Sequence, residues 1–191
     1  MASIKTDKAR QREVNGDGQS SGQGTSKTSK NMMKGLNYAE YKLILQAYGI
    51  TAALNTAIGN QKKAEAAYVN YIHLIEKFFH KDSLETSNAY YLVGVYYFEQ
   101  SLTHKAVACF GKSLAIRRKK FGNSHPSCSD CLVNLGILYK LRGYNNRAEE
   151  ALSSALQIRR ESIGLDSLPT ANTLEELGKF YLETERYKQS Y

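Results

Sequence analysis

Apolar and polar residues recur along most of the chain with a period of 42 residues. The pair Leu135-Gly136 has counterparts at Val93-Gly94 and Leu177-Gly178, and a tyrosine follows each glycine after three positions. The segments "SLAIRR" and "ALQIRR", which begin at Ser113 and Ala155, keep the same offset. A regular period of this length is typical of proteins built by stacking one supersecondary unit.

A more divergent copy precedes these. The segment "GNQKKAEAAY" from Gly59 matches "GYNNRAEEAL" from Gly143, so four copies are detectable and the last is incomplete. Within a copy, apolar residues are spaced by three and four positions, which predicts two amphipathic helices and not strands. In the third copy a turn at 142–146 separates two stripes. They are Leu132, Leu135, Gly136 and Tyr139, and then Ala148, Leu152, Ala155, Leu156 and Ile158.

Small residues and helix-boundary signals agree with this division. We expect five small residues, Gly136, Gly178, Ala64, Ala106 and Ala148, to let neighbouring helix backbones approach closely. Asp82 and Glu85 have the spacing of a capping pair before a helix. Pro126 and Pro169 suit a first helical turn, and Gly122 and Gly164 suit helix ends.

These residues resemble the tetratricopeptide repeat, whose pattern is matched in the third copy by Leu135, Gly136, Tyr139, Ala148, Leu152 and Ala155. The 42-residue spacing and the connection at 121–139 look like the longer repeats of kinesin light chains. The resemblance covers about residues 38–191. It implies an all-α, right-handed α-solenoid of antiparallel helix hairpins. We therefore expect an array at 37–191 with about three hairpins and an incomplete fourth.

The period places Tyr191 only a turn or two into a further second helix. The stripe of Leu174, Leu177, Gly178 and Tyr181 would then lack most of its cover. Since arrays normally end in a polar capping helix, we expect either a fragment of a longer array or a partner that covers this end.

The first 36 residues differ in composition from the rest. Residues 15–30 contain no apolar side chain, which predicts a disordered tail because no surface can be buried to offset conformational entropy. The tail carries seven Lys or Arg against three acids, half of the chain's net charge of +8. It could contact nucleic acid, acidic protein surfaces or anionic lipid. A solvated leader is favoured, because the charges are dispersed among acids.

The sequence shows no apolar run near the roughly 20 residues of a membrane span and no secretory leader. We expect a cytoplasmic protein, with association with the cytoskeleton or a cilium as an open alternative. The histidines form no triad or ligand spacing, so we expect no enzyme, cofactor or metal. Cys128 and Cys131 have the gap of a zinc pair, but no second pair exists, and we expect buried, reduced thiols, as for Cys109.

Two basic segments invite a nucleic-acid interpretation. Arg117–Lys120 and Arg159-Arg160 each precede a predicted helix end, where cations meet the negative end of the helix dipole. This general feature of the repeat explains both segments. Binding of nucleic acid is disfavoured, because a binding face would also need aromatic platforms among its cations.

The resemblance also implies a binding groove along the first helices of the copies. Its second, sixth and ninth positions give a polar ladder with apolar contacts: Asn88, Asp130, Asn134, Asn172, Val95, Ile137 and Lys179. Asn amides can bond both the carbonyl and the amide of a partner backbone, so the ladder suits a peptide or helix. The alternative is that these amides only solvate an exposed face.

The expected function is therefore a non-enzymatic scaffold or adaptor that binds another protein. Two alternatives stay open. In the first, the array is a structural component of a larger cytoskeletal or ciliary assembly. In the second, it is part of a longer repeat protein and regulates an attached domain.

Overall fold

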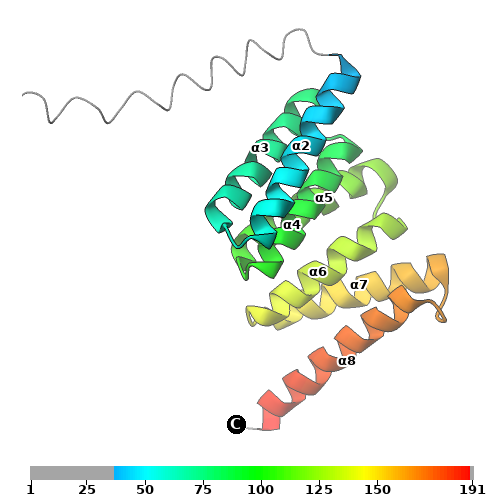
Figure 1. Ribbon diagram of the computed structural model, residues 1–191. Helices are drawn as coiled ribbons and strands as arrows, with labels where there is room; N and C mark the ends of the chain where they lie inside the picture. Colours follow the sequence, from blue (N-terminus) through cyan, green and yellow to red (C-terminus); the bar gives the residue numbers. More distant parts are fainter. Residues whose placement is uncertain (1–36, 190–191) are drawn as a thin grey trace, which may run out of the picture. The chain divides into compact units, whose positions relative to one another are not determined.

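The computed structural model describes residues 37–189, with side chains to residue 185, and all the regular structure in that range is helical (Figure 1). The helices are α2 (Tyr38–Ala57), α3 (Gln61–Phe79), α4 (Leu84–Glu99), α5 (Thr103–Phe121), α6 (Pro126–Leu141), α7 (Asn145–Ile163) and α8 (Leu168–Gln189). The predicted all-α class is confirmed. The predicted disordered tail at 1–36 lies outside the described residues.

The chain divides into two units, with the boundary between Gln46 and Ala47. The described part of the first unit is the beginning of α2. There Asn37 and Glu40 cap the helix reciprocally, since each backbone N–H donates to the other side chain at 2.9 Å. Asn37 is thus the N-cap, in the arrangement known as a capping box.

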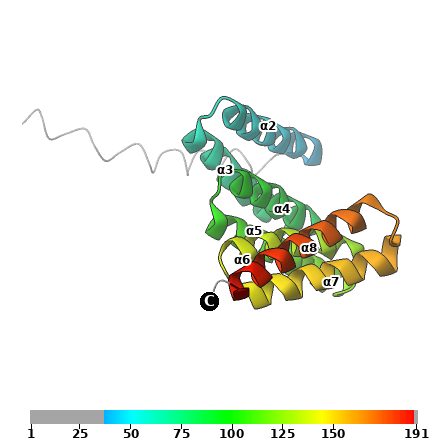
Figure 2. The ribbon, with the colours of Figure 1, turned by 90° about the horizontal axis from the view of Figure 1, so that it is seen from below.

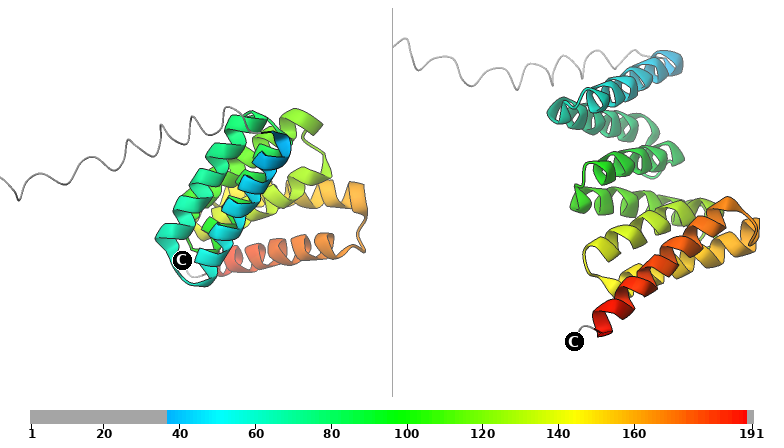
Figure 3. Two further views of the ribbon diagram at one scale, coloured as in Figure 1. Left: turned by 45° about the horizontal axis from the view of Figure 1, so that its top comes forward. Right: turned by 60° about the horizontal axis from the view of Figure 1, so that its bottom comes forward.

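In the second unit, consecutive helices pack against one another from α3 to α8 (Figures 2 and 3). Helices α4 and α5 form one antiparallel hairpin, and α6 and α7 form the next. The first helices begin at Leu84, Pro126 and Leu168, which keeps the 42-residue offset of the sequence. The predicted solenoid of antiparallel hairpins is therefore confirmed.

Two glycines allow the helices of a hairpin to approach closely. A Cβ at Gly94 would lie 2.9 Å from Cε1 of Phe110, and one at Gly136 would lie 2.6 Å from Cγ of Leu152. At Gly178 of α8 no heavy atom would lie within 4 Å. The predicted close approach is confirmed for Gly136 and wrong for Gly178, because no described helix lies on that side of α8.

The predicted capping pair before α4 is wrong. The N-cap is Ser83, whose Oγ accepts from the backbone N–H of Thr86 at 3.1 Å, while Asp82 pairs with Lys119. Thr86 also donates its hydroxyl to the carbonyl of His80 at 2.7 Å. Cys128 and Thr170 repeat this bond in register, so each first helix is tied to the end of the helix before it.

The other boundary predictions are confirmed. Pro126 is the first residue of α6, and Pro169 is the second residue of α8. Gly122 and Gly164 end α5 and α7 with φ of 89° and 82°, a region that L side chains rarely adopt. His125 caps α6, with Nδ1 accepting from the N–H of Ser127.

The final turn expected from the period is absent. In the three preceding copies a residue with positive φ separates the first helix from the second, namely Gly59, Ser101 and Gly143. The same register position is occupied by Glu185, which lies within α8. Helix α8 runs on to Gln189, so the expectation that a second helix begins before Tyr191 is wrong.

Alanine at the two equivalent glycines should have opposite effects. Gly136→Ala should lower the free energy of unfolding by about 1–2 kcal/mol, because Leu152 must shift to admit the methyl group. Gly178→Ala should raise it by up to about 1 kcal/mol, because alanine favours the helix and meets nothing. Urea unfolding of the full chain measures both, and a shift of the same sign in both variants would contradict the packing described.

Candidate functional site

The seven residues of the predicted groove all lie on the first helices α4, α6 and α8, and we call the surface they share the first-helix face. Asn88 and Val95 are on α4, Asp130, Asn134 and Ile137 on α6, and Asn172 and Lys179 on α8. Four of the seven side chains are exposed, namely Asn88, Asp130, Asn172 and Lys179. The other three, Val95, Asn134 and Ile137, are half-buried. Val95 packs against the core of the hairpins.

Asn134 joins two of the first helices. Its Nδ2 donates to the hydroxyl of Tyr91 on α4 at 3.2 Å and to the carbonyl of Asp130 at 3.0 Å. Burial raises the pKa of Tyr91, so its hydroxyl stays protonated and can donate in turn. Sequence reasoning missed Tyr91, because its register counterparts are Val133 and Glu175, which share no aromatic character.

Asn88 and Asp130 are held by buried arginines. Nη2 of Arg117 donates to Oδ1 of Asn88 at 3.2 Å, and Nη2 of Arg159 donates to Oδ1 of Asp130 at 2.5 Å. The two arginines, which we call the inter-repeat arginines, are 9% and 7% exposed. Two residues predicted to read a partner therefore already have partners within the chain.

Each inter-repeat arginine contacts two consecutive first helices. Nε of Arg159 donates to Oγ of Ser129 on α6 at 3.2 Å. Nη1 donates to the carbonyl of Pro169 at 2.6 Å and to Oγ1 of Thr173, both on α8. Arg117 repeats this arrangement one copy earlier, bonding Ser87 on α4 and the carbonyl of Ser127 on α6.

The helix-dipole interpretation of the basic segments is thus wrong for their first residues. Arg117 and Arg159 lie before the last turn and point into the array, whereas Arg118, Lys119, Lys120 and Arg160 occupy the last turns as expected. A signal was present in the sequence, since arginine recurs at both positions together with serine 30 residues earlier.

Neighbouring arginines of α7 should differ sharply in their effect on stability. Arg159→Ala should lower the free energy of unfolding by about 2–4 kcal/mol, because it removes charge-assisted bonds to buried acceptors. Arg160→Ala, at an exposed position, should change it by less than about 0.5 kcal/mol. Equal losses in urea unfolding would show that Arg159 does not join the repeats.

Lys179 and Asn172 complete the first-helix face on α8. Nζ of Lys179 lies 2.7 Å from Oε1 of Glu175 and 2.9 Å from Oε1 of Glu176, which are both on its own helix. Asn172 is exposed and has no side-chain hydrogen bond within the described part of the chain. Asn172 is therefore a ladder residue whose amide oxygen and amide nitrogen are both available to a partner.

The three cysteines are buried thiols, as predicted. Sγ of Cys128 donates to the carbonyl of Gly122 at 3.6 Å, and Sγ of Cys131 donates to Oγ of Ser113 at 3.4 Å. Burial raises the pKa of all three and brings that of Cys109 to about 11. Among residues 37–185 no cluster of three His, Cys, Asp or Glu side chains could hold a metal ion.

Folding should slow the reaction of the cysteine thiols. A raised pKa leaves less thiolate at a given pH, so Cys109 at pH 8 should react with a disulfide reagent on the order of 100-fold more slowly than an unfolded cysteine. All three thiols should titrate rapidly in concentrated urea. Rapid reaction of the folded chain at pH 8 would contradict the burial described.

The described helices include none with the length and apolar character of a membrane span. Comparison with known proteins agrees with the geometry of the hairpins. Residues 85–161, which include most of α4 to α7, match the family model of the tetratricopeptide repeat. This part of the chain carries tetratricopeptide repeats. No curated protein sequence matches it.

The repeats have the fold of kinesin-light-chain-like proteins. The crystal structure of BtubC (BKLC) from P. vanneervenii superposes with a TM-score of 0.67 at 19% identity, over 80% of this chain and 61% of that one. A putative kinesin light chain with nearly identical repeats from Podosopora anserina gives 0.65 at 16% identity, over 76% and 69%. A single-residue variant of that protein gives 0.64 at 17%, over 76% and 68%. This chain thus spans less than two thirds of BtubC.

Proposed function

We propose that this protein is a non-enzymatic scaffold whose first-helix face binds an extended or helical segment of another protein. The observation that carries the proposal is the alternation of half-buried apolar side chains with amides on consecutive first helices. Val95 and Ile137 would supply apolar contact, and Oδ1 of Asn134 would accept a hydrogen bond beside them, since both protons of its Nδ2 are donated within the chain. Tetratricopeptide repeats generally mediate contact between proteins, which supports this assignment.

The inter-repeat arginines refine the role of the polar ladder. Because Arg117 engages only Oδ1 of Asn88, the amide nitrogen remains able to donate to a partner carbonyl. Asp130 likewise keeps a second carboxylate oxygen, since Arg159 contacts Oδ1. A side chain already fixed by an internal bond loses less entropy when a partner binds. The arginines would therefore position Asn88 and Asp130 for binding.

The fold of the comparison proteins supports a cytoskeletal setting for this interaction. A structure named as a putative kinesin light chain shares the hairpin arrangement over 76% of this chain. We propose a cytoplasmic protein whose partner belongs to the cytoskeleton or a cilium, including the case in which the array is a structural part of such an assembly.

The proposal predicts that substitutions on the first-helix face weaken binding to selected peptides. Peptides would be selected from a displayed library against the full chain, and their affinities measured by fluorescence anisotropy. Leu92 on α4 is the register counterpart of Asn134 and also lies on the first-helix face. Asn134→Ala and Leu92→Glu should each weaken binding at least about 10-fold, since the first removes the side-chain amide and the second buries a charge.

Ala108→Glu is the matched control, because it places the same charge at an exposed position on the second helix α5. Leu92 is 44% exposed and Ala108 is also exposed, so neither Leu92→Glu nor Ala108→Glu disturbs the core. Selected peptides that bind all three variants as tightly as the parent chain would exclude the first-helix face as the binding surface.

A further inference from the structure

Helix α8 exposes a face that is covered in the two preceding first helices. We call it the α8 end face, and it consists of Ala171, Leu174, Gly178 and Tyr181. Leu174 is 45% exposed, whereas its counterparts Tyr90 and Leu132 are 6% and 5% exposed. The space above Gly178 is open, whereas Gly94 and Gly136 are each filled by an apolar side chain.

The chain itself shows what covers such a face. Helix α5 covers α4 with Phe110 against Gly94, and α7 covers α6 with Leu152 against Gly136. In both covering helices an alanine lies four residues before the apolar residue and an inter-repeat arginine lies seven residues after it. The arginine reaches Asn88 or Asp130, whose counterpart on α8 is Asn172.

A hollow between the two hairpins has a partial counterpart beside α7. A hollow of about 220 Å³ is bounded by Leu114 and Arg118 of α5 on one side and by α6 and α7 on the other. In the next copy Leu156 and Arg160 line a hollow of about 790 Å³ that reaches Leu165 and Asp166. In the larger hollow, Leu156 and Arg160 are the register counterparts of Leu114 and Arg118, and the rest of its lining comes from α7 and the linker before α8.

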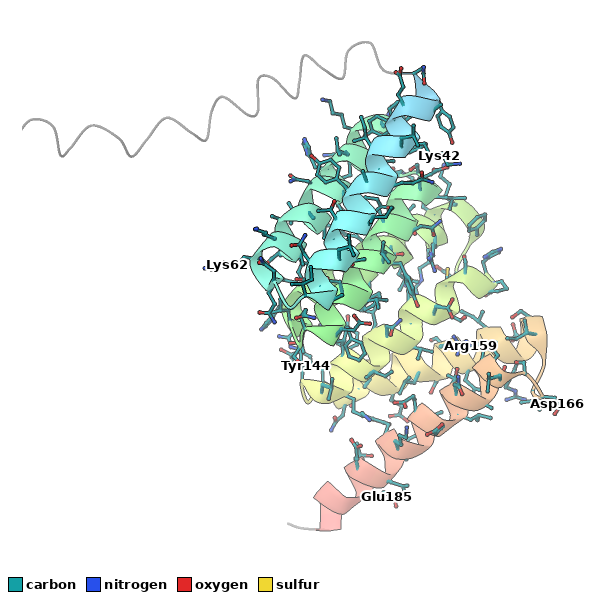
Figure 4. All side chains as sticks on the ribbon, in the orientation of Figure 1. Lys42, Lys62, Tyr144, Arg159, Asp166 and Glu185 are labelled. Carbon is teal, nitrogen blue, oxygen red and sulfur yellow. The ribbon has the colours of Figure 1, made fainter. Side chains whose placement is uncertain are left out.

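The net charge of the residues around the α8 end face favours one kind of partner. Residues 143–189, from the turn before α7 to the end of α8, hold eight acids against six basic residues, a net charge of −2, while the whole chain is +8. The acids are Glu149, Glu150, Glu161, Asp166, Glu175, Glu176, Glu183 and Glu185. Figure 4 shows Asp166 at the linker end of α8 and Glu185 toward its other end. An apolar face in a part of the chain with net negative charge is complementary to a basic amphipathic helix.

We propose that the α8 end face binds a basic amphipathic helix of a partner protein, seated as α5 is seated on α4. Its apolar side chain fills the space above Gly178, and its arginine, seven residues later, bonds Asn172. A second copy of this chain does not offer such a helix within residues 37–185. Helices α5 and α7 are already packed, and α3 has Ile75 where the arginine is required.

The test uses the full chain and a fluorescent peptide with the sequence of α5, Thr103–Phe121, with serine at position 109. A cross-link between positions 108 and 115, which are exposed in α5, keeps the peptide helical. This peptide has six basic residues and no acid, and the α7 peptide, Asn145–Ile163, has three of each. The α5 peptide should bind at least about 10-fold more tightly, and added salt should reduce the difference.

Gly178→Leu should weaken binding of the α5 peptide at least about 10-fold, because the leucine fills the space above the glycine. Gly111→Leu is the matched control, since it places the same side chain at another helical glycine with no neighbour within 4 Å. It should bind the peptide as the parent chain does. Circular dichroism checks that both variants are folded.

Three results would overturn the proposal. They are unchanged binding in Gly178→Leu, no binding of the α5 peptide at about 1 mM, or a dimer in light scattering that Gly178→Leu dissociates. Loss of binding in Leu92→Glu but not in Gly178→Leu would place the peptide on the first-helix face and overturn it equally. Peptides selected for the first-helix face should still bind Gly178→Leu, so the two surfaces can fail independently.

Discussion

The burial of the inter-repeat arginines fixes how consecutive hairpins of the array are arranged, because a guanidinium removed from water requires partners for its donors. Arg159 finds them on α6 and α8 together, so the angle between consecutive first helices is set by one side chain of α7. Packing of the apolar stripes is not directional in the same way. A small rotation of one hairpin against the next would leave the apolar contacts nearly unchanged but would break these hydrogen bonds. The first-helix face inherits its spacing from this constraint.

The sequence predicted the features that depend on periodicity and missed those that depend on contacts between copies. Helix positions follow from the spacing of residues such as Leu132 and Leu135, which is a local property. The partner of Arg159 lies 29 residues earlier at Asp130, and nothing local distinguishes it from the exposed Arg160. The final turn was predicted by extending the period, but the chain stays helical through Glu185 to Gln189.

The two proposed surfaces use different physical means to bind. The first-helix face is polar and already ordered by internal bonds, as between Asn134 and Tyr91, so recognition there would come from directed hydrogen bonds. The α8 end face has apolar groups around an open glycine, so binding there would come from burial of Leu174 and its neighbours. The two surfaces would therefore favour different partner segments, one rich in hydrogen-bonding groups and one with a continuous apolar stripe. An adaptor with both surfaces could hold two partners at once.

The departures of α8 from the repeat are also consistent with an external helix. Ser87 and Ser129 accept from the Nε of an inter-repeat arginine, but their counterpart Ala171 has no hydroxyl. One turn later, the position of Tyr91, whose ring lies 5.0 Å from the guanidinium of Arg117, is taken by Glu175. A carboxylate attracts an arginine more strongly than an aromatic ring does, and at an exposed site this attraction offsets the loss of a hydroxyl acceptor. Glu175 is held by Lys179 in the isolated chain, so an incoming arginine would compete with that lysine. An exposed, charged binding position is what a reversible contact requires, since its charged groups remain solvated when the helix leaves.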